Sequence, residues 1–180
     1  MLYMFFADGF EEVEAIATLD VIRRAGISVE SVGIGSDRIT GSHNITVICD
    51  KTEAEITFDE SVEGVILPGG MPGTTNLMNN KTVSDFIDLC HINNKLICAI
   101  CAAPMILGRK GLLSGKKAVC FPGFEDELIG ASISDAYVCR YDNIITSKGM
   151  GSAINFGLEI VAALIDKQTA DKLKSTLQCS

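Results

Sequence analysis

Hydrophobic residues along the chain alternate between short uninterrupted runs and longer stretches with helical spacing. A short apolar run predicts a strand that is buried on both faces of a sheet. The clearest runs are Leu2–Phe6, Gly64–Leu67 and Leu96–Ile100. We expect further strands at Ser28–Ile34, Ala118–Cys120, Tyr137–Arg140 and Ile144–Thr146. A small antiparallel pair is expected at Ile39–Asn44 and Ile45–Cys49.

The stretches between these runs predict helices. A helix from about Glu11 to Ala25 begins with acidic residues, which suit a helix N-terminus, and Gly26 is its expected C-terminal cap. Later helices are marked by apolar residues at helical spacing: Val83, Phe86, Ile87 and Cys90; Met105, Ile106 and Leu107; Ile154, Leu158, Val161 and Ile165. A short final helix is predicted at Lys167–Leu177. Strand–helix alternation predicts an α/β fold with a mostly parallel sheet and helices on both faces.

Composition narrows the class of protein. The chain has 180 residues, 47% hydrophobic and 21% charged, which favours one globular domain over residues 1–180. The net charge of −8 and the lack of a basic stripe argue against nucleic-acid binding. The apolar start Met1–Phe6 lacks a basic leader, and no run approaches the roughly 20 residues that span a bilayer. We therefore expect a soluble cytoplasmic protein without a membrane partner.

Seven cysteines at irregular spacing argue against a secreted disulfide framework, so we expect most of them to be buried. Cys98 and Cys101 form a C-x-x-C pair, but Cys98 falls within an expected strand, which disfavours a thioredoxin-like role. The two histidines, His43 and His91, lack ligand spacing to a cysteine pair. We expect no metal and no cofactor.

Cys101 is the first candidate functional residue. Ligands of such folds bind at the carboxyl ends of the strands, and Cys101 directly follows one. Ala99 and Ala103 supply the small neighbours that a nucleophile elbow needs, and Pro104 suits the first turn of a helix. We expect the helix N-terminus to lower the pKa of the thiol and favour a thiolate. The alternative is a buried structural cysteine.

Glu14 is the second candidate, about one turn into the first helix. We expect its apolar neighbours Val13 and Ile16 to raise its pKa, so that a protonated carboxyl can donate to a sulfur. Glu11 and Glu12 are expected to be solvated.

Backbone donors complete the predicted site. Gly69 and Gly70 follow a strand and can point N–H groups into the cleft. Together with the N–H group of Ala102 they would form an oxyanion hole, although a glycine pair after a strand can also be a simple turn.

Five segments of the chain resemble motifs of the ThiJ/PfpI superfamily: Asp8–Glu14, Asp20–Gly26, Val65–Gly70, Ala99–Pro104 and Thr146–Gly149. Order and spacing match almost from end to end, and the most similar branch is the Parkinson-disease-associated deglycase and chaperone branch with its bacterial relatives. The resemblance implies a flavodoxin-like three-layer sandwich, as in class I glutamine amidotransferases. It also implies a homodimer with the first helix near the interface.

The resemblance assigns roles to the same residues. Cys101 would be an oxidation-sensitive nucleophile that is hydrogen-bonded by Glu14, and Gly70 and Ala102 would supply backbone N–H groups. The leading hypothesis is a cofactor-independent glyoxalase or deglycase, which acts on methylglyoxal or on glycated proteins or nucleotides. A redox-sensing chaperone, whose Cys101 is oxidised to sulfinate, is the alternative. A cysteine peptidase or amidase is a third hypothesis.

Three residues depart from the family pattern. Phe121 stands where several relatives carry a histidine, and His43 and His91 lie elsewhere in the pattern. A Cys-His dyad is therefore not expected, which disfavours hydrolysis of peptides. Met150 replaces a proline and Lys148 replaces an arginine, changes that bear on the shape of the cleft and on its preference for anions.

Overall fold

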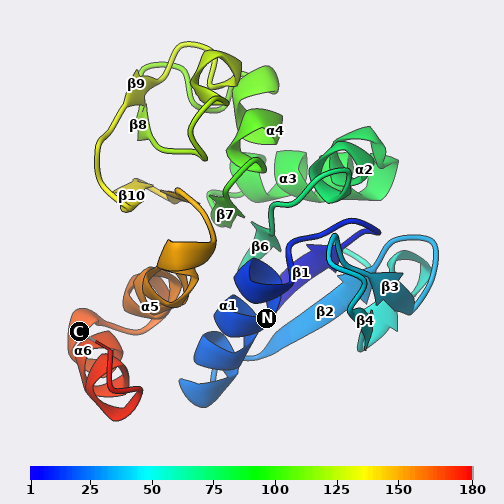
Figure 1. Ribbon diagram of the computed structural model, residues 1–180, viewed down its shortest axis with the longest axis horizontal. Helices are drawn as coiled ribbons and strands as arrows, with labels where there is room; N and C mark the ends of the chain where they lie inside the picture. Colours follow the sequence, from blue (N-terminus) through cyan, green and yellow to red (C-terminus); the bar gives the residue numbers. More distant parts are fainter. Residues whose placement is uncertain (180) are drawn as a thin grey trace.

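The computed structural model describes residues 1–179 and has a seven-stranded central sheet (Figure 1). The strand order is β10-β11-β7-β6-β1-β2-β5, in which only β10 runs antiparallel to its neighbour. Their bounds are β1 Leu2–Phe6, β2 Val29–Gly33, β5 Lys51–Thr52, β6 Gly64–Leu67, β7 Leu96–Ile100, β10 Val138–Tyr141 and β11 Ile144–Ser147. The predicted α/β fold with a mostly parallel sheet is confirmed.

In the part of the chain that the structure describes, six helices accompany the sheet: α1 Glu12–Arg24, α2 Gly73–Asn79, α3 Lys81–Ile92, α4 Pro104–Arg109, α5 Ala153–Leu164 and α6 Lys167–Thr176. Two small sheets lie outside it, namely the antiparallel pair β3 Arg38–Thr40 and β4 Thr46–Ile48, and the parallel pair β8 Lys117–Ala118 and β9 Ser132–Ile133. Single 3₁₀ turns are formed by Glu53–Glu55, Glu125–Glu127 and Met150–Ser152.

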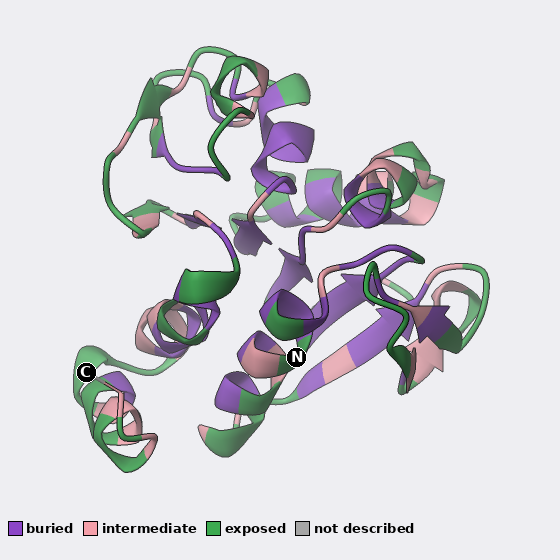
Figure 2. Cartoon of the chain, in the orientation of Figure 1, coloured by how far each residue is buried: buried purple, intermediate pink, exposed green. Residues whose placement is uncertain are grey.

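Alternate residues of β1 build the two sides of the core, because successive side chains of a strand point to opposite faces. Tyr3 and Phe5 pack with Phe86 of α3, and both ring pairs have centroids 5.6 Å apart in edge-on geometry. Leu2, Met4 and Phe6 belong to the other cluster, with residues of α1 and α5. Figure 2 shows the central strands buried along most of their length between these helical layers.

Some elements differ from the sequence prediction. The predicted strands at 39–44 and 45–49 are shorter, because residues 41–45 form the hairpin turn: Gly41 N–H donates to the Ile45 carbonyl, and Asn44 has a φ of 64°. The strand expected at 118–120 ends at Ala118 and joins the small β8–β9 pair instead of the central sheet. Helix α2 and strands β5 and β9 are too short to leave a hydrophobic pattern.

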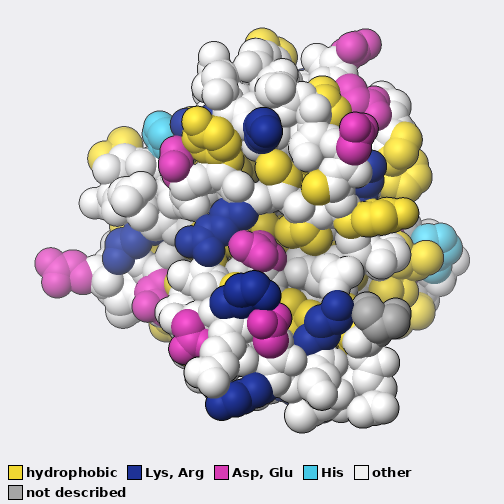
Figure 3. Space-filling view, turned by 90° about the vertical axis from the view of Figure 1, so that its left-hand side faces the viewer, with side chains coloured by type: hydrophobic (Ala, Val, Ile, Leu, Met, Phe, Trp, Pro, Cys, Tyr) yellow, Lys and Arg dark blue, Asp and Glu magenta, His cyan; other side chains and the backbone are white. Residues whose placement is uncertain are grey.

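Within residues 1–179 no helix combines the length and the hydropathy that crossing a bilayer requires. On the side of β10, α5 and α6, lysine and arginine side chains are interspersed with acidic ones (Figure 3).

Gly157 allows α5 to approach α1 closely, and this contact yields a stability prediction. A Cβ on Gly157 would lie 2.9 Å from Cβ of Val21. We expect Gly157→Ala to lower the free energy of unfolding by about 1 kcal/mol, because overpacking outweighs the gain in helix propensity. Urea denaturation measures the change. Gly151→Ala is the control, since its Cβ would meet nothing within 4 Å; equal stability of the two variants would contradict the prediction.

Candidate functional site

Cys101 lies at a sharp turn between β7 and α4. Its φ of 66° is in the left-handed region, which residues other than glycine rarely adopt and which is common at functional sites. The Cys101 N–H donates to the Ser147 carbonyl at 2.9 Å, and its own carbonyl accepts from the Phe121 N–H at 2.8 Å. Two neighbouring segments thus hold the elbow, and Pro104 is the first residue of α4, as the sequence predicts.

Three groups surround the sulfur of Cys101. The backbone N–H groups of Gly70 and Ala102 donate to it, and its side chain shares a hydrogen bond with the Glu14 carboxyl. A Cβ on Gly69 would lie 2.5 Å from both Cys101 Cβ and Glu14 Oε2. Only glycine fits at position 69, because any side chain would overlap the Cys101–Glu14 pair.

Glu14 is buried, with 1% of its surface exposed. Its carboxyl accepts the Gly69 N–H at 3.0 Å and also accepts the Met150 N–H. Burial raises the pKa of Glu14 to about 7, with a further increase from the charge of Glu11, and its hydrogen bonds offset only part of the rise. The carboxyl therefore exchanges its proton near neutral pH, the range in which an acid–base catalyst is most effective.

The elevated pKa was predicted, but its physical cause differs from the prediction. Val13 and Ile16 are 46% and 42% exposed, so they do not bury Glu14. The carboxyl lies against Gly69, Cys101 and Met150. Tertiary contacts, and not the sequence neighbours, remove Glu14 from water.

The expectation of a low thiol pKa was wrong. Burial raises the pKa of Cys101 to about 12, followed by the charge of Glu14 and by their hydrogen bond, while the N–H groups of Gly70 and Ala102 lower it. Helix α4 has only six residues and begins three positions after Cys101, which limits the effect of its dipole. The charge of Glu14 thus disfavours a free thiolate at Cys101, so the thiol proton must leave the sulfur during the reaction itself.

Glu12 was expected to be solvated, yet it is 4% exposed. The His43 backbone N–H donates to Glu12 Oε1 at 2.6 Å, and His43 Nδ1 lies 2.9 Å from Glu12 Oε2. Although burial opposes ionisation, these hydrogen bonds hold the pKa of Glu12 near 2. The pair attaches the β3–β4 hairpin to the start of α1.

Glu11, Glu12 and His43 also have possible metal-ligand atoms within 4.8 Å of one another. Each acidic side chain already has a protein partner: Glu12 binds His43, and Glu11 Oε2 accepts the Glu14 N–H at 2.7 Å as the cap of α1. Within residues 1–179, hydrogen bonds join neither His43 nor His91 to Cys101.

Ser147 and Ser152 are functional-site neighbours that the sequence analysis missed. Both are buried, and their hydroxyl oxygens lie 2.7 Å apart. Ser152 Oγ accepts the Gly149 N–H at 3.2 Å and donates to the Gly149 carbonyl at 2.8 Å. This network fixes the turn whose Met150 N–H reaches Glu14. Two serines five residues apart do not by themselves predict a buried contact, so little in the sequence indicates this network.

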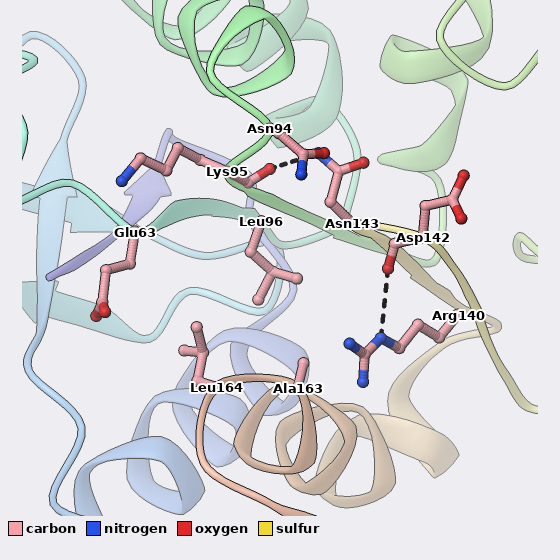
Figure 4. Close-up of a pocket in the computed structure, with 9 residues that line it drawn as sticks. All are labelled: Glu63, Asn94, Lys95, Leu96, Arg140, Asp142, Asn143, Ala163 and Leu164. Atoms are coloured by element: carbon pink, nitrogen blue, oxygen red, sulfur yellow. Dashed lines mark hydrogen bonds between the residues drawn. The ribbon is translucent and has the colours of Figure 1, made fainter.

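A separate cavity of about 420 Å³ lies at the other end of β7 (Figure 4). Its lining includes Leu96, the turn before β11 and the end of α5. In this lining, Asn143 Nδ2 donates to the Lys95 carbonyl at 2.7 Å. None of the predicted site residues lines it. The length of β7 separates this cavity from Cys101.

Known proteins match the chain over nearly its full length. The model of the DJ-1/PfpI family matches residues 1–163. Protein dj-1beta of Drosophila melanogaster is 33% identical over 95% of this chain and 92% of its own length. The Parkinson disease protein 7 homolog of Danio rerio is 32% identical over 95% and 93%. The structure of oxidized Toxoplasma gondii DJ-1 superposes with a TM-score of 0.94 at 31% identity, covering 99% of this chain and 98% of that one.

The Cys101–Glu14 contact predicts how substitution changes thiol reactivity. At about pH 8 Glu14 is mostly ionised, given a pKa of about 7, and it then raises the pKa of Cys101. We expect Glu14→Gln to accelerate alkylation of Cys101 by iodoacetamide at that pH by roughly severalfold, because the negative neighbour is lost. Peptide mass spectrometry measures the rate at each cysteine.

Glu60→Gln, at an exposed position, is the matched control. Slower alkylation of Glu14→Gln than of the unsubstituted protein at the same pH would contradict the expected sign. It would show instead that the ionised Glu14 promotes alkylation by accepting the thiol proton.

Proposed function

Since the chain belongs to the DJ-1/PfpI family, we propose that it is a cofactor-independent enzyme that converts reactive carbonyl compounds. Its substrates would be methylglyoxal or early glycation adducts on proteins or nucleotides. One observation carries the proposal: a cysteine at a strained elbow shares a hydrogen bond with a buried glutamic acid whose pKa is about 7. This combination provides a nucleophile and a matched acid–base group in one place.

The first step would be addition of Cys101 to the aldehyde. The sulfur forms a bond to the carbonyl carbon, the C=O electron pair moves to oxygen, and the thiol proton passes to the Glu14 carboxylate. Glu14 then protonates the oxygen, which gives a neutral hemithioacetal. Gly70 and Ala102 direct their N–H groups to the sulfur and support negative charge there. Gly69, predicted as a third donor, instead donates to Glu14.

A 2-oxoaldehyde would then rearrange. Glu14 removes the hydrogen of the former aldehyde carbon as a proton and returns it to the adjacent carbon, so that the hemithioacetal becomes a thioester. Water hydrolyses the thioester, which releases lactate from methylglyoxal and regenerates the thiol. The overall reaction adds one water molecule, and the oxidation of one carbon balances the reduction of the next.

Cys101→Ser tests this function. We expect it to lower kcat/KM for methylglyoxal by roughly a thousandfold or more, because a hydroxyl with the same partners is a far weaker nucleophile. Lactate formation measures turnover. Cys139→Ser is the control, since this partly exposed cysteine donates only to the Lys117 carbonyl. Retention of the full rate by Cys101→Ser would exclude the proposed enzyme.

A redox-sensing role is the second candidate, and the exposure of the cysteines favours it. Cys101 is partly exposed, whereas four others are fully buried: Cys49, Cys90, Cys98 and Cys120. Two equivalents of peroxide would convert the thiol to a sulfinic acid and release two water molecules. A protonated Glu14 could donate to the sulfinate and so stabilise it. The oxidised protein would then act as a chaperone or bind a partner.

Peroxide titration tests the second candidate. We expect Cys101 to gain two oxygen atoms at peroxide doses that leave the buried cysteines unchanged, because access and hydrogen-bond donors favour the reaction there. Peptide mass spectrometry gives the oxidation of each cysteine. Earlier oxidation of Cys139 or Cys179, which are also partly exposed, would count against a sensor at Cys101.

Peptide hydrolysis is not proposed, since it needs a histidine beside the sulfur and His43 is paired with Glu12. A homodimer stays part of the proposal. The exposed apolar side chains of Val13 and Ile16 on α1 support it, because contiguous apolar surface on a helix favours contact with a second copy. The cytoplasmic location also stays a prediction.

A further inference from the structure

Phe121 lies beside Cys101 and Glu14. Its N–H donates to the Cys101 carbonyl at 2.8 Å, so its position is fixed relative to the nucleophile. A Cβ on Gly149 would lie 3.1 Å from Phe121 Cδ2 and 3.6 Å from Glu14 Oε1. The ring and the carboxyl therefore lie against the same point of the backbone.

Much of the Phe121 ring surface remains open to solvent. The side chain is 47% exposed, although it is a large apolar group next to a buried acid. An exposed ring of this kind gains free energy when an apolar or aromatic group covers it. Met150, whose N–H reaches Glu14, is also apolar and is 55% exposed.

Among the residues that the structure describes, no salt bridge joins Glu14 to a lysine, arginine or histidine. Lys148 directly precedes Gly149, but its Nζ donates to the Asp135 carbonyl at 2.9 Å and lies 5.4 Å from the centre of the Tyr137 ring. The strongest influences on the pKa of Glu14 and of Cys101 include no lysine, arginine or histidine. An anionic ligand at the sulfur would meet Glu14 without a compensating positive charge.

We propose that Phe121 is a specificity-determining residue, whose ring selects neutral carbonyl compounds with an apolar or aromatic substituent over compounds that carry a carboxylate. The inference rests on the proposed carbonyl chemistry at Cys101 and names its substrate class. The substituent packs on the ring while the carbonyl carbon faces the sulfur. The Phe121 ring also disfavours binding of anions, because it offers them no hydrogen-bond donor and no positive charge.

The chain tolerates the substitutions that test this role. The contact of Phe121 with the elbow is a backbone hydrogen bond, which any residue except proline can make. Phe121→Ala removes the ring, Phe121→Leu keeps an apolar group, and Phe121→Lys adds a positive charge. Ile133→Ala is the matched control, since Ile133 is also 47% exposed and lies on β9.

Thiol reagents measure the preference without any need for turnover. Peptide mass spectrometry measures the rates at which N-phenylmaleimide and N-methylmaleimide modify Cys101. Each rate is divided by the rate at which the same reagent modifies 2-mercaptoethanol. We expect a normalised preference for the phenyl reagent of about three- to tenfold, the range of an aromatic contact. Phe121→Ala should bring it near one, Phe121→Leu should retain part of it, and Ile133→Ala should leave it unchanged.

A second reagent pair measures the discrimination against anions. Iodoacetate should react more slowly than iodoacetamide at Cys101, after the same normalisation, and Phe121→Lys should reduce the difference. The proposal is overturned if the unsubstituted protein shows no phenyl preference, or if Phe121→Ala changes it no more than Ile133→Ala does.

Substrate turnover separates this inference from the function on which it rests. We expect a higher kcat/KM for phenylglyoxal than for methylglyoxal, very low activity on 4,5-dioxopentanoate, a 2-oxoaldehyde that carries a carboxylate, and loss of the phenyl advantage in Phe121→Ala. Turnover of all three compounds at similar rates would leave the enzyme in place and overturn the role of Phe121. If no compound is turned over but Cys101 still prefers the phenyl maleimide, the proposed enzymatic function is overturned. The role of Phe121 in recognising an aromatic group is then retained.

Discussion

The hydrogen bond between the buried Glu14 carboxyl and the Cys101 thiol is the interaction on which the site depends. A carboxyl that is 1% exposed is costly unless its oxygens find donors. Gly69 and Met150 supply N–H groups from the ends of two different loops, and the sulfur supplies the third contact. The requirement for glycine at position 69, the left-handed backbone of Cys101 and the buried Ser147–Ser152 pair all serve this one arrangement.

Glu12 and Glu14 show how strongly the surroundings decide the chemistry of a side chain. They are two residues apart on α1 and both are buried, yet the pKa of Glu12 is near 2 and that of Glu14 is near 7. Glu12 faces His43 and backbone donors of the hairpin, which stabilise its charge. Glu14 faces the sulfur and fewer donors, so burial dominates. Glu12 thus stays ionised and anchors the hairpin, whereas Glu14 has the pKa that the proposed acid–base role requires.

Local patterns predicted the architecture well where the elements are long or fully apolar. Leu2–Phe6, Gly64–Leu67 and Leu96–Ile100 were predicted to the residue, since a strand buried on both faces leaves a continuous apolar run. Short elements such as α2 leave no such pattern. For the site, small neighbours and chain position marked Cys101, and the family resemblance joined it to Glu14. The thiol pKa was mispredicted, because the number of buried atoms and the charge of Glu14 are not local properties.

The sequence by itself determined the α/β alternation and the family, and it marked Cys101 and Glu14 as candidate site residues, because hydrophobic periodicity and motif spacing are properties of the linear sequence. Only the tertiary structure decided the burial of Glu12, the proton balance between Glu14 and Cys101, and the place of Phe121 against Gly149 beside the acid. These properties depend on distances between segments far apart in sequence, and desolvation and hydrogen bonding act only across such distances once the chain has folded.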